Sequence, residues 1–287
     1  METYVIHVSK ECNCDCLYCY EKDKTSKYTR TEVLEYAQAI IDTASGDFTV
    51  EFLGGEPMLE WGHIVAVYEL FENSANPAQG YTITTNGTIV SEYIGMYLVN
   101  NRKLNMSISI DGNKFANQLR VFKNGENTYE KVIANCKFLM DFYNVIPTIH
   151  FTTHKFNVSH IYDSIVLLHS KGLKHIAVGT VESTMPIDKE YCDIYIAQLK
   201  KVSDLIKTTN KYKDLYISQF EWLKPKSDIR KYLTDASGKT IGETYGRVEN
   251  DITSKDSYNV KACNETTSVS EMIYNIRETV YLYHNSK

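Results

Sequence analysis

Apolar and polar residues follow two spacings along the chain, and the two spacings take turns. Short runs in which apolar residues recur at every second position predict strands, whereas longer stretches with apolar residues three or four positions apart predict helices. The predicted strands are residues 4–9, 48–55, 81–87, 104–112, 145–154 and 174–181. The predicted helices lie between them, at residues 30–45, 64–73, 91–100, 128–143 and 158–172.

Repeated strand-then-helix units predict an α/β fold with a parallel sheet, either open or closed into part of a barrel. Both arrangements place an active site at the carboxyl ends of the strands. The alternation covers residues 1–210, which we take as one domain, and stops in residues 211–287, which we predict to be an irregular C-terminal cap or lid. Within that segment, residues 268–284 have helical spacing and predict a helix that closes the open side of the barrel.

The composition and net charge mainly serve to exclude classes of function. The chain has 287 residues, of which 43% are hydrophobic, and this is enough for one sizeable core. No apolar run approaches the roughly 18 residues of a membrane span, and no signal-peptide pattern follows Met1. We therefore expect a cytoplasmic protein with no membrane partner. The formal net charge of −5 disfavours nucleic acid as a partner.

The cysteines give the first chemical signal. An odd number clustered at one end of a chain fits metal or redox use in a reducing compartment better than a disulfide framework. Cys136 stands on the apolar face of its predicted helix, so we expect it in the core. The seven cysteines are at positions 12, 14, 16, 19, 136, 192 and 263.

Polar and glycine-rich residues follow the first four predicted strands. The cysteine group follows the first strand, GGEP (54–57) the second, TNG (85–87) the third and SIDG (109–112) the fourth. Each of these loops on its own is a plausible turn. Because the carboxyl ends of parallel strands meet at one rim, we expect the four loops to converge there.

The motif CX3CX2C, formed by Cys12, Cys16 and Cys19, followed some 35 residues later by GGEP, resembles the radical S-adenosylmethionine superfamily. The resemblance implies a partial (β/α)6 barrel and a [4Fe-4S] cluster held by these three thiolates. It also implies that S-adenosylmethionine binds the open iron and is cleaved to a 5'-deoxyadenosyl radical, which abstracts hydrogen from the substrate.

Two alternatives to this interpretation stay open. A structural zinc site would use Cys12, Cys14, Cys16 and Cys19, although one-residue spacings fit poorly with zinc knuckles and zinc leaves GGEP unexplained. A non-enzymatic iron-sulfur redox sensor or cluster carrier is the other. In the family pattern Cys14 occupies a variable position, so we expect it to have no ligand role.

The resemblance also assigns residues to the cofactor. Tyr18 is expected near the adenine, and Gly54 and Gly55 are expected to let the backbone approach the methionyl amino group. Glu56 is expected to accept from that ammonium or to brace the loop, which Pro57 stiffens. The residues expected to bind the ribose and carboxylate, or to order the strand ends, are Thr85, Asn86, Ser109 and Asp111.

Within the superfamily the chain is most similar to the peptide- and protein-modifying branch, the sulfatase-maturating and SPASM-like enzymes. Arg120 resembles an arginine of that branch that reaches the S-adenosylmethionine carboxylate. Asn113 stands where the branch usually has proline, and Ala116 and Asn117 stand where it has His-Asp. After the predicted barrel only Cys192 and Cys263 remain, so we expect no auxiliary cluster of the kind found in the branch, and we expect no leader-binding domain before Cys12.

The implied partners are a peptide or protein substrate, an external flavodoxin- or ferredoxin-like electron donor and a separate leader-binding protein. The implied reaction is oxidation, crosslinking or epimerisation, and the alternative is a small-molecule or nucleotide substrate. His150 and His154 share one face of a predicted strand that ends at the rim, where one of them could touch substrate. We also consider a thiol that returns hydrogen to the substrate radical, Cys263 before Cys192.

Overall fold

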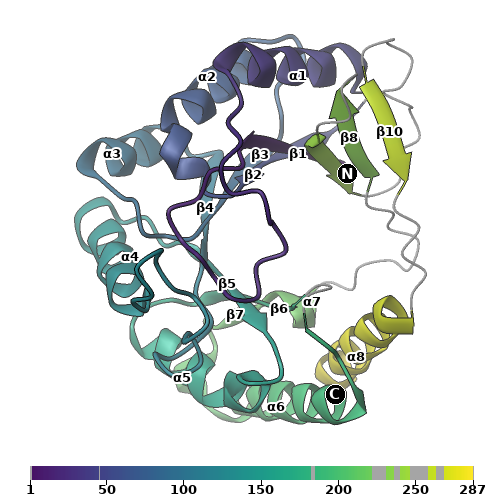
Figure 1. The fold of residues 1–287 in the computed structure, drawn as a ribbon. Coiled ribbons are helices and arrows are strands. Elements are labelled where there is room, and N and C mark those ends of the chain that lie inside the picture. The colour runs from purple at the N-terminus through teal and green to yellow at the C-terminus, as the bar shows by residue number, and fades with distance from the viewer. Residues whose placement is uncertain are drawn as a thin grey trace.

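A strongly curved parallel sheet forms the centre of the molecule, and helices cover its convex face (Figure 1). The computed structural model describes residues 2–44, 46–181, 185–221, 231–235, 240–245, 258–262 and 268–286. The six main strands are β1 (Glu2–Ser9), β2 (Phe48–Gly54), β3 (Gly80–Thr85), β4 (Leu104–Ser109), β5 (Thr148–Thr153) and β6 (His175–Thr180). They pair in parallel and in chain order, and they confirm all six predicted strands to within three residues at either end.

Each main strand is followed by a helix. The five predicted helices are confirmed, and a sixth helix follows β6, where the sequence reading had named none. The helices are α1 (Arg30–Thr43), α2 (Trp61–Glu72), α3 (Glu92–Asn100), α4 (Tyr129–Tyr143), α5 (Ile161–Ser170) and α6 (Lys189–Thr208), with single 3-10 turns η1 (Pro57–Glu60), η2 (Val158–His160) and η3 (Asn210–Tyr212).

Local sequence explains where several of these helices begin and end. Thr29 and Glu32 form a reciprocal capping box at the start of α1, which satisfies two backbone N–H groups that the first turn leaves open. Asp188 caps α6 by accepting from the backbone N–H of Tyr191. α4 ends at Asn144, whose φ of 52° is in the left-handed region that asparagine tolerates.

The region after residue 210 differs in part from the irregular cap that the sequence predicts. The sheet continues through β7 (Tyr216–Ile217), which pairs with β6, and α7 (Ser218–Glu221) follows. At the opposite edge β9 pairs antiparallel with β1, and β8 and β10 extend the sheet further. The three strands are short, and β8 and β9 show no clear two-residue spacing of apolar positions. In β10 the residues Tyr258, Val260 and Ala262 do alternate with polar residues, but over only five positions. The three strands are β8 (Lys231–Asp235), β9 (Thr240–Tyr245) and β10 (Tyr258–Ala262).

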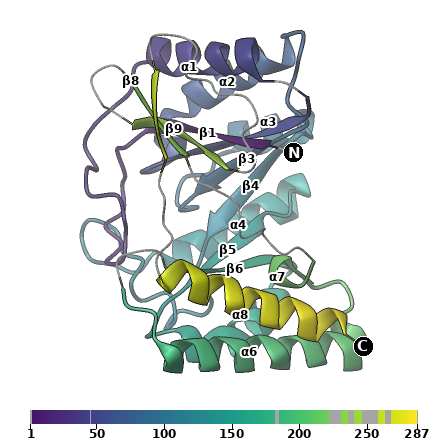
Figure 2. The same cartoon turned by 90° about the vertical axis from the view of Figure 1, so that its right-hand side faces the viewer.

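The last helix, α8 (Ser268–Asn285), confirms the predicted helix at 268–284. It packs against α6 and α7, and Figure 2 shows it beside α6. Closure of the open side of the sheet by this helix stays a prediction. The division of the chain into two units at residue 210 stays a prediction.

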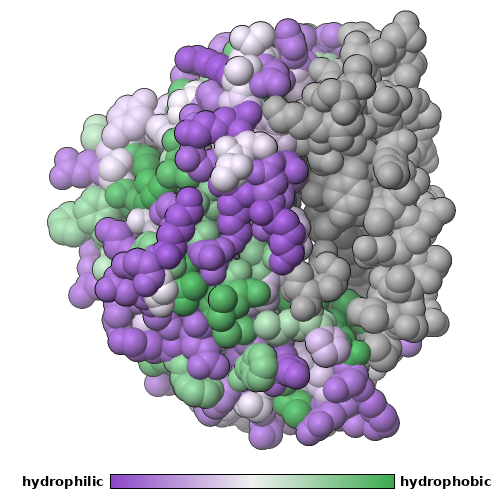
Figure 3. Space-filling model, viewed as in Figure 1, coloured by the Kyte–Doolittle hydropathy of each residue, from purple (hydrophilic) through white to green (hydrophobic). Residues whose placement is uncertain are grey.

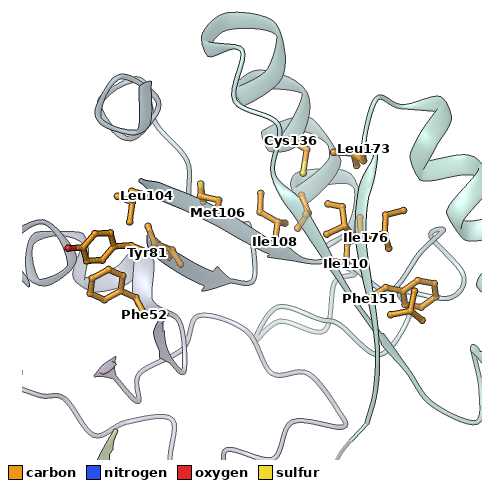
Figure 4. Close-up of a cluster of buried hydrophobic side chains, with 14 of the residues drawn as sticks. Phe52, Tyr81, Leu104, Met106, Ile108, Ile110, Cys136, Phe151, Leu173 and Ile176 are labelled. Atoms are coloured by element: carbon orange, nitrogen blue, oxygen red, sulfur yellow. The ribbon is translucent and has the colours of Figure 1, made fainter. Parts of the chain in front are cut away.

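The main hydrophobic core lies between the convex face of the sheet and the helices. Alternate strand residues point into it, such as Phe52 from β2, Ile108 from β4 and Phe151 from β5 (Figure 4). Cys136 points from α4 toward the sheet and is buried, as its place on the apolar face of the helix predicts. This packing fixes the strands and therefore the positions of the loops that follow them.

A core truncation tests this packing. Phe52 is fully buried between β2 and the helices, so we expect Phe52→Ala to lower the free energy of unfolding by about 3–5 kcal/mol, through lost burial and the cavity left behind. Urea denaturation of the reduced apoprotein measures this. Phe142 is 74% exposed on α4 and gives the matched control, because Phe142→Ala is expected to change stability by no more than about 0.5 kcal/mol. Equal effects of the two substitutions would contradict this core.

Candidate active site

The loop that follows β1 carries the four clustered cysteines and lies at the end of the sheet where the parallel strands finish, which we call the rim (Figure 1). This loop is held along one side by the segment after β4. The backbone N–H groups of Asp15 and Leu17 donate to the carbonyl oxygens of Val121 and Leu119, at 2.8 and 3.0 Å. The loop therefore has a fixed path although it contains no helix and only isolated bridges.

The GGEP segment lies directly against the start of this loop. The backbone N–H of Gly55 donates to the carbonyl oxygen of Ser9, and that of Glu56 donates to the carbonyl oxygen of Glu11, both at 2.8 Å. A Cβ atom on Gly54 would lie 2.0 Å from the Ser9 oxygen, and one on Gly55 would lie 2.2 Å from the Lys10 oxygen. Both glycines are thus required for this close approach of two backbones.

The Glu56 carboxylate joins this segment to the loop after β3. It is fully buried and accepts hydrogen bonds from the Thr85 hydroxyl at 2.6 Å, from the Asn86 backbone N–H at 2.7 Å and from the Met58 backbone N–H at 3.0 Å. Of the two roles that the sequence left open for Glu56, the contacts support bracing of the loop. Pro57 begins the short turn η1 that follows.

Asn86 connects the same network to the cysteines. Its side-chain nitrogen Nδ2 donates to the Asn13 side-chain oxygen Oδ1 at 2.7 Å and lies 3.3 Å from the Cys14 sulfur and 3.9 Å from the Cys12 sulfur. The Asn13 side chain in turn donates to the Thr88 hydroxyl at 2.9 Å. Asn13 and Thr88 were not among the predicted site residues, because single polar residues in a loop carry no spacing that marks them.

The thiols of Cys12 and Cys14 are not equivalent. Cys12 accepts from the Cys14 thiol and from the Cys14 backbone N–H, and these hydrogen bonds lower the pKa of Cys12 to about 6. Donation to Cys12 and burial raise the pKa of Cys14. Burial also raises the pKa of Cys16. The environment therefore favours the thiolate at Cys12, a predicted ligand, and the thiol at Cys14, which was predicted to have no ligand role.

The donor set fits an iron-sulfur cluster. Cys12, Cys16 and Cys19 are free thiols on one loop, and thiolates are the ligands that such clusters use. Within the described ranges no three Cys, His, Asp or Glu side chains are already close enough together to hold a metal ion. The three thiols would therefore converge when the cluster binds, as metal ligands commonly do.

A second group of buried polar side chains lies beside the cysteine loop. Asp111, two residues beyond β4, forms an ion pair with Arg120, whose Nε lies 2.9 Å from a carboxylate oxygen. The Asp111 carboxylate also accepts from the Tyr18 hydroxyl at 2.5 Å and from the Thr152 backbone N–H at 3.1 Å. The Arg120 guanidinium lies 5.3 Å from the centre of the Tyr18 ring. Burial raises the pKa of Tyr18 well above its ordinary value, so its hydroxyl stays protonated and donates.

His154 lies next to this group and has one unused polar atom. Its ring centre is 5.4 Å from that of Tyr18, and its Nδ1 accepts from the Phe156 backbone N–H at 3.3 Å. Burial lowers the pKa of His154, so the ring is neutral and Nε2 carries the proton. Nε2 is buried with no hydrogen-bond partner. A ligand at this place would find a donor there, which is a further observation in favour of a bound cofactor.

Most of the predicted site residues come together at this rim. Ser109 is buried at the end of β4. His150 lies within β5, whereas His154 comes directly after the end of that strand. Cys192 is buried in the hydrophobic core on α6, and Cys263 lies outside the described residues. Asn117 and Thr152 were missed as supports of Asp111 and Arg120, because only the fold brings them near.

A curved parallel sheet that carries three free thiols on a loop at its carboxyl rim is the architecture of an iron-sulfur enzyme of the α/β class. A family model described as the Radical SAM superfamily matches residues 6–168, more than half of the chain. The chain belongs to this superfamily, whose members use a [4Fe-4S] cluster and S-adenosylmethionine.

Several individual proteins are similar to this chain. An uncharacterized protein of Methanocaldococcus jannaschii is 23% identical over 77% of this chain and 75% of its own length. The radical SAM cyclopropyl synthase TigE of Paramaledivibacter caminithermalis is 25% identical over 48% of this chain and 33% of its own. Among solved structures, native anSMEcpe with bound AdoMet and Kp18Cys peptide has a TM-score of 0.67 at 22% identity, over 77% of this chain and 64% of that one. The chain thus spans less than two thirds of anSMEcpe and a third of TigE.

None of the described helices is long and apolar enough to cross a membrane.

The buried Asp111–Arg120 pair gives a stability prediction. We expect Asp111→Asn to lower the free energy of unfolding by about 3–5 kcal/mol, because the Arg120 charge would remain buried without its partner. The exposed Glu130–Lys114 pair is the control, and Glu130→Gln is expected to cost less than about 1 kcal/mol. Urea denaturation of the reduced apoprotein compares them. A cost for Asp111→Asn as small as that of the control would argue against the buried pair.

Glu56 gives a pH prediction. Burial raises its pKa to about 7, although three donors oppose the shift. Between about pH 4.5 and 7 the folded state therefore binds more protons than the unfolded state, so this carboxyl makes the free energy of unfolding fall as pH rises, by up to about 3 kcal/mol. In the variant Glu56→Gln the side chain has no ionisable group, so this pH dependence is removed. We expect the wild type's advantage over this variant to be largest near pH 5 and to shrink by pH 8, and a pH-independent difference would show that the carboxyl is not raised.

Proposed function

We propose that this chain generates a 5'-deoxyadenosyl radical from S-adenosylmethionine and uses it to abstract hydrogen from a side chain or Cα of a peptide or protein. The observation that carries the proposal is the pairing of GGEP with the cysteine loop, because this pairing positions three free thiols at the rim of a curved parallel sheet. Oxidation, crosslinking and epimerisation are the reaction types that it could perform.

Some of the site residues would bind the cluster, and others would position the cofactor. Cys12, Cys16 and Cys19 would hold the cluster, which supplies the electron that cleaves S-adenosylmethionine. Tyr18 lies between Cys16 and Cys19 in the same loop, and the hydrogen bond from its hydroxyl to Asp111 fixes the position of its ring. Ion pairing with Asp111 holds the Arg120 guanidinium in place, where it is available to a carboxylate of the cofactor.

A peptide or protein substrate is supported by the relatives. The structure of anSMEcpe that shares this fold contains a bound peptide. We include an external flavodoxin- or ferredoxin-like electron donor and a separate leader-binding protein among the proposed partners. The hydrogen-donor role of Cys263 also remains a prediction.

Cysteine substitutions test the proposal. After anaerobic reconstitution, we expect Cys12→Ala, Cys16→Ala and Cys19→Ala each to lose the four-iron absorbance and nearly all formation of 5'-deoxyadenosine with dithionite and S-adenosylmethionine. Cys14→Ala is the matched control from the same loop, and we expect it to keep at least about half of the bound iron, since its thiol is a donor to Cys12 and not a ligand.

The other readings predict different results. A redox sensor or cluster carrier would bind iron but form no 5'-deoxyadenosine, and a structural zinc site would retain zinc and need all four cysteines. A small-molecule enzyme would form 5'-deoxyadenosine yet leave every candidate peptide from neighbouring genes unmodified by mass spectrometry. Loss of the cluster on changing Cys14 alone would overturn the ligand assignment.

A further inference from the structure

The sulfur of Cys12, one of the three predicted cluster ligands, lies among three hydrogen-bond donors. The Cys14 backbone nitrogen donates to it at 3.4 Å, and the Cys14 thiol donates to it as well. The Asn86 side-chain nitrogen Nδ2 lies 3.9 Å from the same sulfur. Neither Cys14 nor Asn86 is a predicted ligand, so ligation of the cluster does not explain why both are directed at Cys12.

Cys14 also connects two of these donors to each other. The Asn86 Nδ2 lies 3.3 Å from the Cys14 sulfur, and the Cys14 thiol in turn donates its proton to Cys12. A thiol sulfur can accept and donate at the same time, and hydrogen bonds in such a chain strengthen one another. The Asn86 amide therefore acts on the Cys12 sulfur both directly and through Cys14.

The orientation of the Asn86 amide is fixed by Thr88 and Asn13. The Asn86 Oδ1 accepts from the Thr88 backbone N–H at 2.9 Å and from the Thr88 hydroxyl at 2.7 Å. The Asn86 Nδ2 donates one proton to the Asn13 Oδ1 at 2.7 Å, and the Asn13 amide donates to the Thr88 hydroxyl at 2.9 Å. The three side chains thus form a closed ring of hydrogen bonds, and the second proton on Nδ2 is available to the sulfurs.

The position of Asn86 depends on the GGEP segment. Its backbone N–H donates to the buried Glu56 carboxylate at 2.7 Å, so the contact that orders the loops also places the amide beside the cysteines. The sulfurs lie away from water, since Cys14 is 1% exposed and Cys12 is 8% exposed. Hydrogen-bond dipoles act more strongly in such a site than in water, because the local dielectric is low.

We propose that Asn86 and Cys14 raise the reduction potential of the [4Fe-4S] cluster by directing their hydrogen bonds at the Cys12 sulfur. Reduction adds one electron, and the sulfur ligands carry part of the added negative charge. N–H and S–H dipoles directed at a ligand sulfur therefore stabilise the reduced cluster more than the oxidised one. This inference rests on the proposed function, in which Cys12 holds the cluster, and it makes Asn86 and Cys14 positioning residues that act through Cys12.

Redox titration tests the inference. Anaerobically reconstituted protein is equilibrated with methyl viologen, whose one-electron reduced form passes its electron to the cluster, and the reduced cluster is quantified by its electron paramagnetic resonance signal. We expect Asn86→Ala and Cys14→Ala each to lower the equilibrium constant for this transfer about fivefold, the effect of one lost hydrogen bond. A fivefold change corresponds to about 40 mV for one electron. The iron content of each sample confirms that the cluster is loaded.

Further variants separate hydrogen bonding from a general loss of structure. Cys14→Ser keeps a donor beside the Cys12 sulfur, so we expect it to restore most of the change caused by Cys14→Ala. Thr88→Val removes the hydroxyl that orients the Asn86 amide, and we expect a smaller fall than in Asn86→Ala. Thr84→Val is the matched control, with no expected change, because the Thr84 hydroxyl donates to Glu51 instead.

The outcomes separate this inference from the proposed function. An unchanged equilibrium constant in Asn86→Ala or in Cys14→Ala, or an equal fall in Thr84→Val, would overturn the inference. Formation of 5'-deoxyadenosine with dithionite would still support the proposed function in those cases. If Asn86→Ala loads no cluster, Cys14→Ala and Cys14→Ser decide, since equal equilibrium constants in these two would overturn the inference. The expected changes in a protein that forms no 5'-deoxyadenosine would uphold the role of Asn86 and Cys14 and refute the proposed radical chemistry.

Discussion

The close backbone contact between GGEP and the start of the cysteine loop is the constraint on which the site depends. Two hydrogen bonds join Gly55 and Glu56 to the carbonyl groups of Ser9 and Glu11, and no side chain could fit at either glycine. The Glu56 carboxylate extends the contact to the loop after β3. The loops that follow β1, β2 and β3 are thereby joined close to the ends of their strands. The start of the cysteine loop is therefore fixed in position.

A second buried group supports the same loop from the other direction. Asp111 pairs with the Arg120 charge and accepts hydrogen bonds from Tyr18 and Thr152, and the three residues come from separate segments of the chain. An ion pair in this setting contributes to order more than to stability, because both charges lose their water on folding. Its position beside the cysteine loop, together with the unpartnered Nε2 of His154, indicates that the rim is arranged for a bound ligand.

The two faces of the sheet differ in character, because successive side chains along each strand point to opposite faces. Residues such as Phe52 and Phe151 pack against the helices and fix the strand positions, while their neighbours on the concave face line a polar cavity. The stability of the sheet therefore comes from one face, which leaves the other face available for polar groups. Figure 3 shows the rim side of the molecule, with hydrophilic and hydrophobic side chains mixed over the loops that follow the strands.

The sequence by itself determined the fold class, the six main strands and the residues of the cysteine and GGEP motifs, because spacing and local motifs are short-range properties. Only the tertiary structure decided that Glu56 braces a loop, that Asn13 and Thr152 support the site and that Cys192 lies in the core. These roles depend on segments far apart in the chain. The strands β8–β10 were missed for a similar reason, since each is only five or six residues long and is defined by its pairing with β1 or with a neighbouring short strand.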